Sequence, residues 1–174
     1  KSRHEKFTSL YHHICDEDNL RDCYKRMDGS KAKGIDGVSK IDYGKDLKFK
    51  LGKLSNRLRQ MSYRPQVKRR VYIQKAGSEQ GRPLGISCFE DKIVEKAVKQ
   101  VLEGIYEEMF EENSYGYRPG RSQHDCLREL GRIIKQERVG YVVEADIRGF
   151  FDQVNHDWMM KFLEHRIGDK RVLR

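Results

Sequence analysis

The stretch that decides the fold class is Tyr141-Val-Val-Glu-Ala-Asp-Ile-Arg-Gly-Phe-Phe151. Its first five residues favour a β-strand, and Asp146 stands where that strand would end. Strand alternation would put Glu144 and Asp146 on one face and Val143, Ala145 and Ile147 on the other. One face would then pack while the other carries polar groups. The alternative is a strand that simply ends in a solvated turn.

The pairing of a carboxylate with a nearby aromatic residue suggests a chemistry. A carboxylate at a strand end can hold Mg²⁺ against a triphosphate, because Mg²⁺ takes oxygen ligands and usually binds one or two carboxylates plus substrate phosphates. Phe151, five residues after Asp146, can lie against an incoming sugar. A nucleotide polymerase needs both features.

The composition excludes several classes of protein. A chain of 174 residues and 20.6 kDa suffices for one domain, or for one domain and part of another. No apolar run approaches the roughly 18 residues of a membrane span, and no charged-then-apolar start resembles a signal peptide. We therefore expect a soluble intracellular protein without membrane contact. Cys15, Cys23, Cys88 and Cys126 form no C-x-x-C pair, so neither a zinc site nor a disulfide framework is predicted.

Positive charge is concentrated in one block. From Tyr43 to Lys75 there are eleven Lys or Arg and one acid, a net charge of +10 in a chain whose total is +9. Tyr63 and Tyr72 lie within this basic block, and such a mixture suits the phosphates and bases of a nucleic acid. The alternative is a solvated helix face. The candidate nucleic-acid-binding residues of the block are Lys48, Lys53, Lys68, Arg69 and Arg70.

Hydrophobic periodicity predicts a mostly helical chain with one β-hairpin. Three glycines in ten residues from Asp28 to Gly37 predict a mobile loop. Asn155 is the expected cap of the last helix, and Asp18 or Asn19 of the second. Helices are predicted over residues 6–14, 18–27, 43–61, 90–110 and 156–166. A further helix is predicted to follow Ser122 and to end near Glu137. Strands are predicted over 67–74, 82–86 and 141–145.

Four segments in order carry a resemblance across nearly the whole chain. They are Gly34-Ile-Asp-Gly37, Arg82-Pro-Leu-Gly-Ile86, Ser114-Tyr-Gly-Tyr-Arg-Pro-Gly-Arg-Ser122 and Ala145-Asp-Ile-Arg-Gly-Phe-Phe-Asp152. In this order they resemble the bacterial group II intron-encoded reverse transcriptases, also called maturases. The resemblance implies an α+β fold with reverse-transcriptase fingers over 1–139 and the first strand and helix of the palm over 140–174. The fingers would include the N-terminal helices, the Gly-rich loop 28–44, the basic helix and the hairpin.

The resemblance also implies roles for single residues. Asp146 would be catalytic and would hold Mg²⁺ together with the carbonyl of Ile147. Lys75, Arg82 and Phe151 would bind the deoxynucleotide, with Phe151 excluding a 2′-hydroxyl. A pairing of Arg82 with Glu79 is the alternative for that arginine. Arg118 and Arg121 would contact the template, although the glycines around them could serve only to make the turn.

The sequence departs from the family pattern in one respect. It has no Tyr-x-Asp-Asp turn and no adjacent Asp-Asp pair. We therefore expect an excised fragment, inactive alone, whose parent copies RNA in a bacterial cytoplasm with intron or template RNA, an RNA–DNA duplex and dNTP as partners. The alternatives are a non-catalytic RNA-binding splicing module and a basic domain that binds no nucleic acid. Exposed apolar edges would favour a homodimer.

Overall fold

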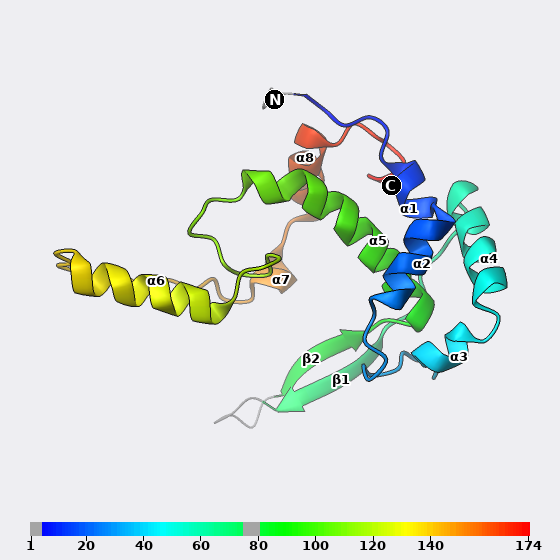
Figure 1. The fold of residues 1–174 in the computed structure, drawn as a ribbon, viewed down its shortest axis with the longest axis horizontal. Coiled ribbons are helices and arrows are strands. Elements are labelled where there is room, and N and C mark those ends of the chain that lie inside the picture. The colour runs from blue at the N-terminus through cyan, green and yellow to red at the C-terminus, as the bar shows by residue number, and fades with distance from the viewer. Residues whose placement is uncertain (1–4, 75–80) are drawn as a thin grey trace.

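The structure is a computed structural model that describes residues 5–74 and 81–174. Its main part, which we call the helical body, contains four packed helices with a two-stranded hairpin below them (Figure 1). The predicted α+β, mostly helical class with one hairpin is confirmed. The four helices are α1 (Tyr11–Cys15), α2 (Glu17–Lys25), α4 (Leu47–Arg59) and α5 (Phe89–Tyr106).

The core of the helical body comes from the apolar stripes of α4 and α5. Leu51 and Leu54 of α4 are fully buried, as are Ile93 and Ala97 of α5. Residues at such three- and four-residue spacings share one helix face, so both helices turn a continuous apolar surface inward. Lys48, Lys53 and Arg59 of α4 are left exposed on its outer faces.

The single helix predicted over 43–61 is divided in two. A short helix α3 (Lys40–Gly44) ends before Asp46, whose backbone is left-handed at φ 60°. Such a residue cannot continue a right-handed helix, so α4 starts afresh at Leu47. Periodicity alone could not show this break, because Tyr43 and Leu47 both face the core.

The β-hairpin is formed by β1 (Arg69–Gln74) and β2 (Gly81–Ile86), paired antiparallel from Arg69↔Ile86 to Gln74↔Gly81. Side chains two residues apart on a strand share a face, so Arg70 and Tyr72 lie together. Arg82 lies opposite Ile73 in the register and therefore on the other face. Arg70 and Arg82 therefore lie on opposite faces of the hairpin.

A second region, which we call the arm, follows α5. It comprises a 3₁₀ turn (Glu107–Met109), α6 (Gln123–Gln136), α7 (Phe150–Gln153) and α8 (His156–Arg166). Helix α6 stands away from the helical body (Figure 1), and none of its side chains is buried. The predicted α8 is confirmed, with the Asn155 side chain accepting from the Trp158 N–H at 3.0 Å. The cap of α2 is Asp16 rather than Asp18 or Asn19.

The predicted strand over 141–145 is not formed. Residues 139–147 have no regular structure and are exposed throughout. A strand needs a neighbouring strand for its backbone hydrogen bonds, and no described strand pairs with this segment. Residues 141–145 favour a strand but have no partner strand for hydrogen bonding among the described residues.

The chain returns from the arm to the helical body through a clasp, residues 166–173 packed on residues 7–11. Phe7 donates to the Arg166 carbonyl and accepts from the Gly168 N–H, both at 2.8 Å. The buried Asp169 carboxylate accepts from the Leu10 and Tyr11 N–H groups at 3.0 and 2.9 Å. The clasp therefore joins the two ends of the described chain. Across residues 5–74 and 81–174, no helix is long and apolar enough to cross a membrane.

Candidate nucleic-acid interface

The structure divides the basic block into cations that hold the fold and cations left for a ligand. Side-chain nitrogens of six residues bind carboxylates or backbone carbonyls within the chain. These six are Lys45, Lys50, Arg57, Arg64, Lys68 and Arg69. Their charge is already committed to internal contacts, so they are weaker candidates for phosphate binding than their positions in the sequence suggest.

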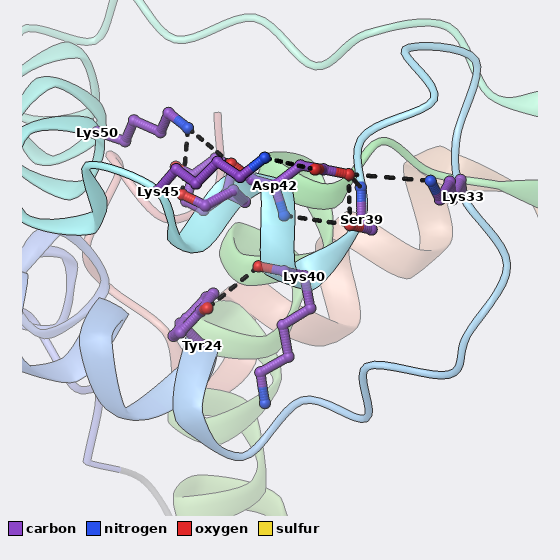
Figure 2. Close-up of polar contacts among 8 residues, drawn as sticks. Tyr24, Lys33, Ser39, Lys40, Asp42, Lys45 and Lys50 are labelled. Carbon is purple, nitrogen blue, oxygen red and sulfur yellow. Dashed lines mark hydrogen bonds and ion pairs between the residues drawn. The ribbon is translucent and has the colours of Figure 1, made fainter.

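Two of these cations, Lys45 and Lys50, make polar contacts with helix α3 (Figure 2). Ser39 and Asp42 form a capping box, in which the Ser39 Oγ accepts from the Asp42 N–H and Asp42 accepts from the Ser39 N–H. Lys45 and Lys33 approach the same carboxylate at 3.4 and 3.9 Å. Hydrogen bonds from Ser39, with a smaller contribution from Lys45, lower the pKa of Asp42 to about 2. Asp42 therefore stays ionised at neutral pH.

Two further cations tie α4 to its neighbours. Lys50 donates to the carbonyls of Asp42 and Tyr43 at 3.0 and 3.2 Å (Figure 2). Arg57 pairs with Glu90 of α5, which also accepts from the Tyr43 hydroxyl at 3.0 Å. Burial, followed by the neighbouring Glu90 charge, raises the pKa of Tyr43, which therefore remains protonated. These contacts hold α4 against α3 and α5.

On the hairpin, two of the three consecutive basic residues at 68–70 are engaged. Lys68 lies 3.2 Å from Glu95 of α5, and Arg69 donates twice to the Lys33 carbonyl at 2.8 and 3.1 Å. Arg70 has no hydrogen bond or ion pair to any described residue. It shares its face with Tyr72, whose side chain is 64% exposed. Arg70 and Tyr72 therefore present an accessible cation and an accessible aromatic ring on the same face.

Five cations of the hairpin and α4 have no partner in the described part of the chain. They are exposed and carry uncompensated charge, which suits contacts to phosphate. These residues are Lys48, Lys53, Arg59, Arg70 and Arg82. Lys75 lies outside the described residues, as does Glu79, the proposed alternative partner of Arg82.

The Gly-rich loop, predicted to be mobile, is fastened by lysines that the sequence analysis did not select. Lys92 donates to the Ala32 carbonyl at 2.6 Å and Lys96 to the Arg26 carbonyl at 3.0 Å. Lys40 donates to the Met27 carbonyl at 2.5 Å. A side chain on Gly34 would meet the Cys88 backbone at 2.6 Å, so only glycine fits there. Backbone carbonyls carry no sequence signal, which is why these contacts could not be anticipated.

In the tyrosine–arginine turn, Arg118 makes several contacts within the chain. The Arg118 side chain is 7% exposed and pairs with Glu107 at 2.8 Å. It also donates to the carbonyls of Glu111 and Ser114 at 2.7 and 3.0 Å. Arg118 therefore stabilises the turn, and its contact with a template stays a prediction. Arg121 donates to the Glu112 carbonyl and stacks over Tyr115, and its contact with nucleic acid stays a prediction.

Asp146 and Phe151 lie on the exposed part of the arm. Phe151 is 79% exposed and touches Phe150 edge-on, with ring centroids 5.5 Å apart. Gly149 adopts φ 61°, a conformation that glycine accepts readily, and so turns the chain into α7. Asp146 is exposed, and the described residues contain no group of three or more potential metal-ligating side chains. Asp146 can therefore supply one ligand of a metal site but not a complete site.

Comparisons with known proteins identify the class. The family model of the reverse transcriptase (RNA-dependent DNA polymerase) matches residues 73–173. The chain therefore belongs to the reverse transcriptase family. Enzymes of this family generally use divalent metal ions.

More particular similarity is to proteins of group II introns. The chain is 34% identical over 168 residues to the group II intron-encoded protein LtrA of Lactococcus lactis subsp. cremoris, covering 97% of this chain and 28% of that protein. It is 36% identical over 148 residues to protein YkfC of Escherichia coli strain K12, covering 83% and 39%. Nuclear intron maturase 2, mitochondrial, of Arabidopsis thaliana is 32% identical over 87 residues, covering 49% and 11%. These relatives put the chain with the group II intron reverse transcriptases and maturases, of whose length it spans less than half.

Proposed function

We propose that this chain is the fingers, residues 1–139, and the beginning of the palm, residues 140–174, of an RNA-directed DNA polymerase of a group II intron. Within that enzyme the chain binds intron or template RNA. The observation that carries the proposal is the set of exposed cations on α4 and the hairpin that have no partner in the described chain. Such cations bind a polyanion at little cost, since no internal ion pair has to be broken.

The catalytic part of the proposal rests on the arm. Asp146 and the carbonyl of Ile147 would hold Mg²⁺, which would neutralise charge on the triphosphate. Arg82 would bind the same triphosphate bidentately, as a lysine could not, and Phe151 would contact the sugar of the deoxynucleotide. The RNA–DNA duplex and dNTP are accordingly partners of the complete enzyme.

A second candidate function is a non-catalytic RNA-binding module that promotes splicing. It is favoured by the exposed position of Asp146 and by the lack of a three-ligand metal group among residues 5–74 and 81–174. Primer extension on an RNA template with Mg²⁺ separates the two functions when the complete parent enzyme is compared with its Asp146→Asn variant. We expect no extension by this chain alone, extension by the parent and none by the variant, whereas a parent that extends no primer would favour the non-catalytic module.

The RNA-binding proposal is tested by the salt dependence of affinity. Binding of a structured RNA is measured from 50 to 300 mM salt for the wild type and for Arg59→Gln with Arg70→Gln. Each lost phosphate contact should reduce the slope of log affinity against log salt by about 0.7 to 0.9. The matched control is Arg128→Gln with Arg132→Gln, which removes the same charge from α6, where both arginines are already paired.

Two results would contradict this function. A shallow slope for the wild type would mean that few phosphates are contacted. Equal slopes for the interface variant and the α6 control would mean that net charge, rather than the cations of α4 and the hairpin, drives the binding.

A further inference from the structure

Helix α4 carries one aromatic residue outside its buried stripe. Phe49 is 73% exposed, whereas Leu51 and Leu54 of the same helix are fully buried. A solvent-exposed phenylalanine contributes nothing to the core and leaves a large apolar ring in water. Its neighbours in the helix include Lys48 and, one turn further on, Lys53, both exposed. The ring therefore lies between cations, as in surfaces that stack nucleic-acid bases.

A shallow hollow of about 640 Å³ lies beside this ring. It is formed where the start of α4 meets the start of α2. Gly52, three residues after Phe49, leaves the space open, because a side chain there would approach the Glu17 carboxylate, at 3.6 Å for its Cβ alone. The lining residues are Glu17, Asp46, Leu47, Lys48, Phe49 and Gly52.

Among the described residues, four charged groups around the hollow make no contacts that stabilise the fold. The carboxylates of Glu17 and Asp46 have no hydrogen bond or ion pair within the described chain, and neither have the ammonium groups of Lys48 and Lys53. Asp46 occupies the N-cap position of α4 but makes no side-chain capping bond. Two hydrogen-bond acceptors and two cations therefore surround an exposed aromatic ring without internal partners.

We propose that this hollow binds one unpaired guanine of an RNA strand. The base stacks on Phe49, and its adjacent N1–H and N2–H₂ donors meet a carboxylate of Glu17 or Asp46, since an ionised carboxylate offers two acceptor oxygens. Lys48 and Lys53 take the flanking phosphates. Uracil fits worst, because two carbonyl oxygens flank its single N3–H and face the carboxylates.

This site deepens the proposed RNA binding and rests on it. An unpaired base is favoured over a duplex because a base within a helix cannot expose a face to the ring. A second copy of the chain, through an arginine, or an anionic membrane would also meet these charged groups and the aromatic ring, but neither would distinguish one RNA base from another. Selectivity for one base is therefore the property that distinguishes the proposed occupant.

The test uses four 11-nucleotide RNAs, U11 and three versions with a single central G, A or C, with affinities measured by fluorescence anisotropy. The guanine RNA should bind the wild type several-fold more tightly than U11. Phe49→Ala should lower its affinity about tenfold without changing the salt slope, because stacking involves no counterion release. The matched control is Ile41→Ala, which truncates another exposed apolar residue, 77% exposed on α3.

Two further variants separate the polar groups. Glu17→Gln with Asp46→Asn should abolish the preference for guanine while affinity for U11 is kept or rises, because two negative charges are removed. Lys48→Gln with Lys53→Gln should reduce the salt slope by about 1.4, from about 0.7 for each single-strand phosphate. Circular dichroism checks that each variant keeps its helix content.

The outcomes distinguish this site from the general proposal. If the wild type binds no RNA, both are overturned. Salt-dependent binding that Phe49→Ala leaves unchanged, or equal affinity for all four RNAs, overturns the guanine site and leaves the RNA-binding function standing. Binding to anionic vesicles that Phe49→Ala weakens, without base preference, would assign the surface to a membrane instead.

Discussion

The helical body and the arm use the same sequence signals with different results. Helices α4 and α6 are both amphipathic, but Leu54 of α4 is fully buried while Leu130 of α6 is 45% exposed. Both α3 and α6 begin with a capping box, Ser39 with Asp42 and Ser122 with Asp125. Local signals thus specify a helix in either region, whereas burial requires a second surface. Stability therefore resides in the helical body, whereas α6 of the arm exposes apolar side chains to solvent.

The largest expected effect comes from truncating equivalent leucines in the two regions. Leu54→Ala removes a fully buried side chain and should lower the free energy of unfolding by about 3 kcal/mol, through lost burial and the cavity left behind. Leu130→Ala should cost less than about 0.5 kcal/mol. Urea titrations followed by circular dichroism measure both. Similar losses for the two variants would mean that α6 is packed as tightly as α4.

A smaller effect is expected at the clasp, which ties the end of the arm to the helical body. The Asp169 side chain is 3% exposed and accepts three hydrogen bonds from Arg171, at 3.0 to 3.1 Å, as well as those from residues 10 and 11. Asp169→Asn should cost about 2 kcal/mol, because hydrogen bonds to a charged group are lost. Asp152→Asn, on the exposed α7, is the control and should be nearly neutral.

The pH dependence of this clasp has a definite sign. The hydrogen bond from Arg171, with those from the backbone of Tyr11 and Leu10, holds the pKa of Asp169 well below its usual range. A lowered pKa contributes stability above the unfolded value of about 3.9, and this contribution is lost as the pH falls towards the folded value. The stability difference between wild type and Asp169→Asn should therefore be constant from pH 7 to 5 and shrink below pH 4. A difference that does not change with pH would show that charge is irrelevant there.

Sequence reasoning succeeded where the signal is local. The apolar stripe of α4, the Asn155 cap of α8 and the alternation of β1 each lie within a dozen residues, and all three elements are present. The clasp was missed because Asp169 and Leu10 are far apart in the sequence. The internal contacts of Arg118 could not be predicted, because its partners are mostly backbone carbonyls. Of the candidate site, the exposed Lys48, Lys53, Arg70 and Arg82 were selected from the sequence, whereas Phe49 was overlooked although it falls outside the leucine stripe.

The smallest effect distinguishes the two capping boxes. Ser39→Ala should lower the global free energy of unfolding by about 1 kcal/mol, the usual cost of a lost N-cap, because α3 is packed on the helical body. Ser122→Ala removes the equivalent bond from the Asp125 N–H, 3.2 Å long, but α6 has no buried side chain and should unfold without disturbing the core. Its cost should appear only as faster hydrogen exchange in the first turns of α6, with the global midpoint unchanged. A shift of that midpoint by Ser122→Ala would mean that the arm and the helical body unfold as one unit, because a local cap affects global stability only when its helix is part of the cooperative core.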